Sequence, residues 1–216
     1  MYDRITLSYM PTEPRNLFRH YISCHQEFGG DIGEPLQMAL VMGGKKPATT
    51  FDPPEEMFSS FPDHSPSTLV EKWGLRYRRV KGDYALMVSP STHWFDLLPT
   101  VGLNNDTGVR RHGLFFGYPF EDIEYFLQVE EAILPGKKYV SEGVFSAEEM
   151  AYCVFTFYRP EYSKEGYDRA IEIGKQHYES LHRLSDKWEL TELAELTEQL
   201  HSDYIKRYTA DPILAD

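Results

Sequence analysis

The main local concentration of positive charge in the chain suggests a site for an anion. Arg76 and Arg78 lie two residues apart in a segment typical of a β-strand, so their side chains are expected on one face. Two guanidinium groups can hold a carboxylate or a phosphate through paired hydrogen bonds. Lys46, which follows a pair of glycines, would add a third positive charge. We therefore predict that these three residues bind an anionic group; the alternative is a solvated strand whose arginines pair with surface carboxylates.

A second group of candidates surrounds a Gly-Tyr-Pro turn. His112 precedes the turn, Tyr118 lies within it, and Asp122 follows it at the start of a predicted helix. A helix N-terminus attracts anions, but here the neighbouring carboxylates of Glu121 and Asp122 would repel a bound anion. We predict that His112, Tyr118 and Asp122 orient the rest of a ligand, the alternative being a purely structural turn. If the protein is an enzyme, His112 or Asp122 is its general base.

One helical face carries residue types that bind metals. His20, Cys24 and Glu27 follow one another at helical spacing. Zinc needs three or four ligands, and no second closely spaced pair of histidine or cysteine is present. We therefore expect no metal site, keep these residues as the alternative, and interpret Cys24 as a small buried side chain. A haem accessory role would use histidines of the last helices, but no attachment motif is present.

Sequence signatures of common enzymes are absent. The chain has no Gly-x-Ser-x-Gly, His-Glu-x-x-His, Gly-x-Gly-x-x-Gly or Walker segment. The sequence thus favours a binding protein over an enzyme and indicates no particular cofactor.

Charge and cysteine content narrow the range of partners. The chain has 22 Lys and Arg against 34 Asp and Glu, a net charge of −12, which argues against nucleic-acid and anionic-membrane binding. Its two cysteines, Cys24 and Cys153, are interpreted as reduced thiols. No signal peptide is recognisable, and no apolar run approaches the ~18 residues of a membrane span. We expect a cytoplasmic protein with neither a nucleic-acid nor a membrane partner.

The spacing of apolar residues predicts the elements that position these candidates. They are, in chain order, a helix over 16–28, an apolar stretch over 36–42, an exposed loop over 52–66, a short helix over 67–73, a hairpin of strands 75–80 and 84–88, a helix over 92–98, a buried strand over 111–117, a helix from Pro119, a helix opened by the capping box Ser146 and Glu149 and stopped by Pro160, and two C-terminal helices.

This order of elements favours an α+β fold, because the strands lie in the middle third and helices fill the last third. We predict a small antiparallel sheet built on the central hairpin and packed by helices. Residues 1–160 would form the α+β core domain, and residues 161–216 a helical extension packed on it. The leucine stripe near Glu189–Glu198 is expected to pack on its own domain, with a homodimer through the C-terminal helices as the alternative.

Four segments, in order, resemble an uncharacterised bacterial family marked by Gly-Leu-Phe-Leu-Gly-Tyr-Pro and an acidic helix start. The matching segments, which span roughly residues 36–158, are Met42–Ala48, Gly74–Val88, Gly113–Phe126 and Gly136–Gly143. Two cysteines of that family correspond here to Met38 and Glu142, so the resemblance implies no thiol chemistry at those positions. It implies no particular activity either.

The sequence as a whole therefore predicts a ligand-binding or regulatory protein that takes a small anionic molecule. The pocket would lie between the hairpin and the helix that follows the Gly-Tyr-Pro turn. Three alternatives stay open: an enzyme acting on a phosphate- or carboxylate-bearing small molecule, a protein-interaction or assembly module built on the C-terminal helices, and a metal or haem accessory protein.

Overall fold

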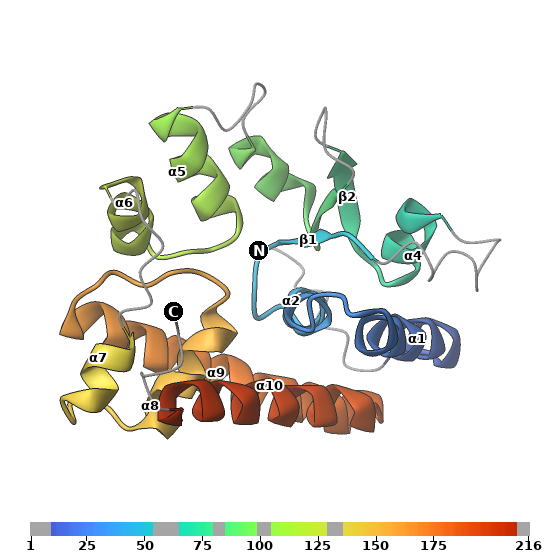
Figure 1. Cartoon of the computed structure of the whole chain (residues 1–216). Coiled ribbons are helices and arrows are strands. Elements are labelled where there is room, and N and C mark those ends of the chain that lie inside the picture. Colours follow the sequence, from blue (N-terminus) through green and yellow to red (C-terminus); the bar gives the residue numbers. More distant parts are fainter. Residues whose placement is uncertain (1–9, 54–64, 80–84, 99–104, 129–135, 211–216) are drawn as a thin grey trace.

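Two long C-terminal helices form the base of the molecule (Figure 1). The computed structural model describes residues 10–53, 65–79, 85–98, 105–128 and 136–210. α9 (Lys164–Trp188) is capped by the Ser163 hydroxyl, which accepts the Gly166 N–H. The chain reverses at Glu189, whose backbone is left-handed with φ 52°, and returns as α10 (Thr191–Thr209). Both predicted C-terminal helices are thus present.

The main hydrophobic core lies between this base and the first two helices. α1 (Thr12–Phe28) and α2 (Gly33–Met42) bury their apolar faces against α9 and α10. Trp188 of α9 shares this core with Phe18 of α1 and with Trp73, whose ring meets Phe18 edge to face at 5.4 Å. The C-terminal helices therefore help to build the same core as the N-terminal ones.

A three-stranded antiparallel sheet covers the other side of α2. Its order is β1 (Thr49–Phe51), β3 (Leu86–Ser89) and β2 (Arg76–Arg79), with Thr49 opposite Val88 and Arg76 opposite Ser89. The central strand β3 is buried along its whole length, whereas β2 is an exposed edge strand. The predicted α+β fold and its β2–β3 hairpin are confirmed, within a mostly helical structure.

The short helices around the sheet follow their capping signals. α4 (Pro66–Lys72) begins after Ser65, whose side chain accepts the Thr68 N–H, and the predicted helix near 92–98 is a 3₁₀ helix, η1 (Thr92–Leu97). Most of the predicted loop over 52–66 lies outside the described residues, as does the hairpin turn at Lys81–Asp83.

The predicted strand over 111–117 is wrong, because this segment belongs to a helix. α5 (Asp106–Phe115) starts at Asn105, whose side chain accepts the Gly108 N–H, so a local cap favours the helix. Arg111 then donates a hydrogen bond of 3.0 Å to the Leu97 carbonyl, which holds α5 against η1. Gly117 turns the chain with φ 76°, and α6 (Phe120–Gln128) follows Pro119 as predicted.

The helix predicted from Ser146 to Pro160 is interrupted. Its capping box is present and opens α8 (Ala147–Ala151), but the chain then tightens into the 3₁₀ helix η2 (Tyr152–Thr156). η2 packs tightly on α9, and it ends at Phe157, whose φ is 59°. α7 (Gly136–Ser141) precedes α8. No helix in the described part of the chain is long and apolar enough to cross a membrane.

Candidate functional site

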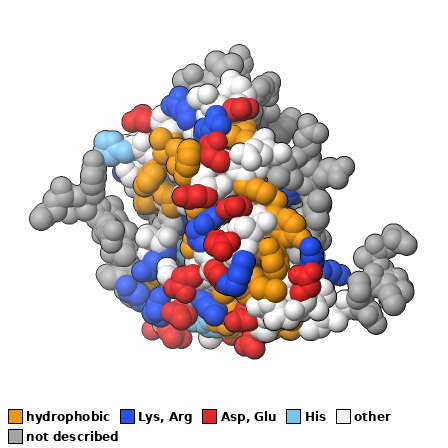
Figure 2. Space-filling model, turned by 90° about the vertical axis from the view of Figure 1, so that its left-hand side faces the viewer, with side chains coloured by type: hydrophobic (Ala, Val, Ile, Leu, Met, Phe, Trp, Pro, Cys, Tyr) orange, Lys and Arg blue, Asp and Glu red, His pale blue; other side chains and the backbone are white. Residues whose placement is uncertain are grey.

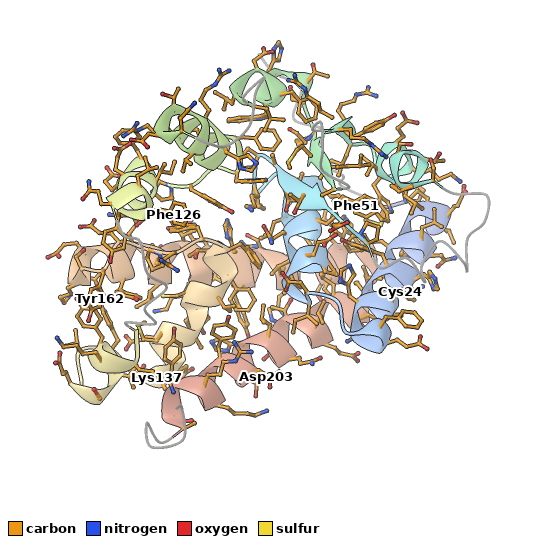
Figure 3. The ribbon with its side chains drawn as sticks, turned by 45° about the horizontal axis from the view of Figure 1, so that its top comes forward. Cys24, Phe51, Phe126, Lys137, Tyr162 and Asp203 are labelled. Atoms are coloured by element: carbon orange, nitrogen blue, oxygen red, sulfur yellow. The ribbon has the colours of Figure 1, made fainter. Side chains whose placement is uncertain are left out.

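A cavity of about 520 Å³ lies beside the Gly-Tyr-Pro turn, between α5, α6 and the loop after η2. We name it the turn cavity. It is lined by Val109, His112, Gly113, Phe116, Tyr118, Asp122, Ile123, Phe126, Tyr158 and Arg159. Phe126 comes from α6 and is labelled in Figure 3. The walls are mainly apolar and aromatic, with a few polar groups, which is the usual character of a small-molecule site.

Three of the residues predicted to orient a ligand meet at this cavity. His112 comes from α5, Tyr118 from the turn and Asp122 from α6. The His112 ring lies 4.6 Å from the Phe116 ring, measured between centroids. The Tyr118 hydroxyl donates a hydrogen bond of 2.9 Å to the Phe157 carbonyl, so this ring ties the turn to the loop after η2. Burial raises the pKa of Tyr118 to about 12.

Asp122 has a structural partner. Its Oδ1 atom accepts a hydrogen bond of 2.9 Å from Arg169 of α9 and another of 2.7 Å from the Glu161 backbone N–H. The Asp122 side chain is 1% exposed. The Arg169 guanidinium therefore balances the one carboxylate of the cavity wall, and this pair attaches α6 to α9.

Tyr158 and Arg159 complete the cavity from the loop after η2. The Tyr158 ring lies 5.2 Å from the Tyr118 ring. Its hydroxyl is buried beside the Asp122 carboxylate. Burial, followed by the nearby Asp122 carboxylate, raises the pKa of Tyr158. The site thus holds a neutral hydroxyl that is able to donate a hydrogen bond to a ligand oxygen or nitrogen.

Lys46 lies behind the aromatic wall of this cavity rather than on it. Its Nζ atom donates a hydrogen bond of 2.7 Å to the Gln37 side-chain oxygen. The same atom lies 5.4 Å from the Phe116 ring centroid, 5.3 Å from that of Tyr118 and 5.6 Å from that of Phe157. Lys46 is 4% exposed, and this burial lowers its pKa to about 7.

A second cavity, of about 610 Å³, lies on the other side of the loop after η2. We name it the tyrosine cavity, since Tyr158, Tyr167, Tyr204 and Tyr208 are among its lining residues. Tyr158 and Arg159 line both cavities. Gln37 and Phe157 line the tyrosine cavity, whereas Phe116 and Tyr118 line the turn cavity. All four of these side chains contact Lys46, which therefore lies between the two cavities.

The two arginines of the predicted anion site do not reach either cavity. Both are exposed on the edge strand β2. Arg78 donates a hydrogen bond of 3.0 Å to the Phe95 carbonyl, which holds β2 against η1. The structure therefore separates Arg76 and Arg78 from His112, Tyr118 and Asp122.

The metal candidates lie on α1, away from both cavities. His20 and Cys24 contact each other, with 3.3 Å between Nε2 and Sγ, and Glu27 is exposed. Figure 3 labels Cys24 on this helix. Within the described ranges, no three histidine, cysteine, aspartate or glutamate side chains are grouped closely enough to hold a metal ion.

Sequence reasoning missed Tyr158 and Arg159. The run from Phe157 to Pro160 combines two aromatic residues with an arginine before a proline, and Pro160 by itself predicts only the end of a helix. Its aromatic and basic composition, typical of loops that line sites, is the signal that could have identified it.

Comparisons with protein-family models, with curated proteins and with solved structures find no match for this chain. The resemblance to the bacterial family with the Gly-Tyr-Pro motif stays a prediction.

Proposed function

We propose that this protein binds a small molecule that has an aromatic or apolar body and an anionic group. The observation that carries the proposal is the composition of the turn cavity. Apolar and aromatic side chains line most of it, and Arg159, His112 and the Tyr158 hydroxyl provide its polar contacts. A ligand body of this kind would be bound by burial, and its polar group would fix its orientation.

The charge of the cavity wall supports an anion rather than a cation. Asp122 is the carboxylate of the wall, and its charge is balanced by Arg169. Arg159 places its guanidinium at the same wall, and a guanidinium group suits a carboxylate, sulfonate or phosphate. We therefore assign anion recognition to Arg159 in place of Arg76 and Arg78.

A pair of fluorescent probes tests this proposal. 1-Anilinonaphthalene-8-sulfonate has an aromatic body and a sulfonate, and N-phenyl-1-naphthylamine has a closely related body without the charge. Replacing Arg159 by Met removes a charge-assisted hydrogen bond, so we expect the affinity for the sulfonate to fall about tenfold. Affinity for the neutral probe should change less than about twofold.

The matched control is the double variant Arg76→Met and Arg78→Met, which removes two exposed arginines outside the cavity. It should bind both probes as the unchanged protein does. Equal losses for both probes in Arg159→Met, or a selective loss of the sulfonate in the control, would show that the turn cavity does not recognise the anion.

We also propose a cytoplasmic location. Cys24 and Cys153 are both buried, and neither takes part in a disulfide. Buried reduced thiols are typical of a reducing compartment.

A further inference from the structure

Lys46 is buried without a carboxylate partner in the described part of the chain. A buried ammonium group is usually paired with a carboxylate, because removing its charge from water is costly. In the described part of the chain no Asp or Glu side chain forms an ion pair with Lys46, and the Gln37 amide oxygen is its hydrogen-bond acceptor. The three surrounding rings offset part of the cost when the amine is protonated.

The position of the amine brings it close to both cavities. The rings of Phe116 and Tyr118 separate it from the turn cavity, and Phe157 and Gln37 separate it from the tyrosine cavity. These three rings are half-buried rather than buried. A bond between the amine and a ligand in the turn cavity requires the ring of Phe116 or Tyr118 to turn aside, a side-chain motion that is fast compared with the labelling reaction.

We propose that Lys46 is a covalent attachment site for a carbonyl compound, an aldehyde or a ketone, that occupies the turn cavity. The neutral Lys46 amine attacks the carbonyl carbon, a C–N bond forms, and the proton moves from nitrogen to oxygen to give a carbinolamine. Loss of the hydroxyl group with a proton, as one molecule of water, leaves the imine. The step needs neither an oxidant nor a reductant.

The surroundings favour the neutral amine that this attack requires. Burial lowers the pKa of Lys46 to about 7, so a large share of the amine is unprotonated at neutral pH. An exposed lysine has a pKa of about 10.4 and is almost entirely protonated there.

The test traps the imine on the full-length protein. The protein is incubated at pH 7.5 with benzaldehyde and cyanoborohydride, which reduces an imine to a stable secondary amine, and labelled peptides are mapped by mass spectrometry. We expect Lys46 to be labelled at least about tenfold faster than the exposed neighbour Lys45. Labelling spread evenly over the lysines, or absent from Lys46, would overturn the proposal.

Two matched variants check the assignment. Lys46→Met keeps a chain of similar length and removes a buried charge, so it should fold and lose the fast labelling. Lys45→Met removes the exposed neighbour and should keep it. Fast labelling that survives in Lys46→Met would contradict the proposal, and the site mapped in the unchanged protein gives the answer even if that variant fails to fold.

This inference rests on the turn cavity of the proposed function. A second aldehyde distinguishes imine formation at Lys46 from anion recognition by Arg159. 4-Carboxybenzaldehyde adds an anion to the same ring, so its labelling of Lys46 should exceed that of benzaldehyde, and Arg159→Met should remove the difference. Fast labelling by benzaldehyde without any effect of the carboxylate would retain the imine and reject anion recognition. Slow labelling of Lys46 by both aldehydes would reject the imine. The naphthalene probes would in that case still report on anion binding.

Discussion

Burial shifts the pKa values of two ionisable groups, Glu34 and His25, toward their uncharged forms. Glu34 of α2 accepts hydrogen bonds from the Tyr21 hydroxyl and, at 2.8 Å, from the Asp52 N–H, yet burial raises its pKa to about 7. The His25 Nε2 atom lies 4.0 Å from the Glu34 carboxylate, and burial lowers the pKa of His25 to about 4. Near pH 7 the pair therefore holds an uncharged imidazole next to a half-ionised carboxyl.

Glu34→Gln should stabilise the protein above neutral pH. The pKa of Glu34 is higher in the folded state, about 7, than its ordinary 4.5, so between these values the folded state binds more protons. The stability of the unchanged protein therefore falls as pH rises through this window. Glutamine keeps the acceptor oxygen and cannot ionise, so we expect a gain of about 2–3 kcal/mol at pH 8 and almost none at pH 4.5.

Urea unfolding of both proteins at these two pH values measures this difference. The exposed Glu27→Gln is the matched control, and it should change stability by less than about 0.5 kcal/mol at either pH. A gain for Glu34→Gln that is equal at pH 4.5 and pH 8 would show that its source is packing rather than ionisation.

The helices α9 and η2 approach each other closely at Gly174 of α9. An added Cβ atom there would lie 1.9 Å from the backbone oxygen of Tyr152 in η2. Backbone cannot move aside as a flexible side chain can. Because η2 leads directly into the loop of Phe157, Tyr158 and Arg159, this contact also sets the wall shared by the two cavities.

Gly174→Ala should destabilise the protein by about 2–4 kcal/mol, because α9 and η2 must separate to admit the methyl group. Helix propensity alone predicts the opposite, a gain of about 1 kcal/mol for alanine inside a helix. The free energy of unfolding in urea decides between them. Gln176→Ala, at an exposed position of the same helix, should change it by less than about 0.5 kcal/mol.

Apolar side chains also reach the surface over part of the fold. On the face that carries α6 and α7, hydrophobic side chains gather in patches between charged ones (Figure 2). Phe120 and Phe126 of α6 are 54% and 51% exposed, whereas Ile123 of the same helix is buried, so the apolar side of this helix is only partly covered. Its Phe126 and Ile123 side chains face the turn cavity.

The leucine stripe of α10 lies in the main hydrophobic core. Leu193, Leu196 and Leu200 belong to the same hydrophobic cluster as Phe18 and Leu36. A chain that ends at Glu189 lacks these side chains and exposes the apolar faces of α1 and α2. We expect it to lose cooperative thermal unfolding, as followed by circular dichroism.

A melting temperature within a few degrees of that of the full chain would contradict this expectation. The alternative of a homodimer through the C-terminal helices is consequently tested on the full chain, by light scattering, because truncation would remove core and interface together.

Features that depend on neighbouring residues could be predicted from the sequence. The capping box at Ser146 and Glu149, the helix start after Pro119 and the β2–β3 hairpin all follow from hydrogen bonds, turns or alternation within a few residues. The same local signals indicated α1 and both C-terminal helices, and with them the α+β class.

Burial and the meeting of distant segments were decided only by the tertiary structure. The run from Arg111 to Gly117 is apolar enough for a strand, and its helical state follows from the Asn105 cap and from packing on η1. Tyr118 and Tyr158 are 40 positions apart in the chain, yet their rings form one wall. Arg76 and Lys46, both basic, end at the surface and in the interior respectively, because solvent exposure depends on which elements cover a residue. The sequence around a residue does not determine which distant elements cover it, and so does not determine its solvent exposure.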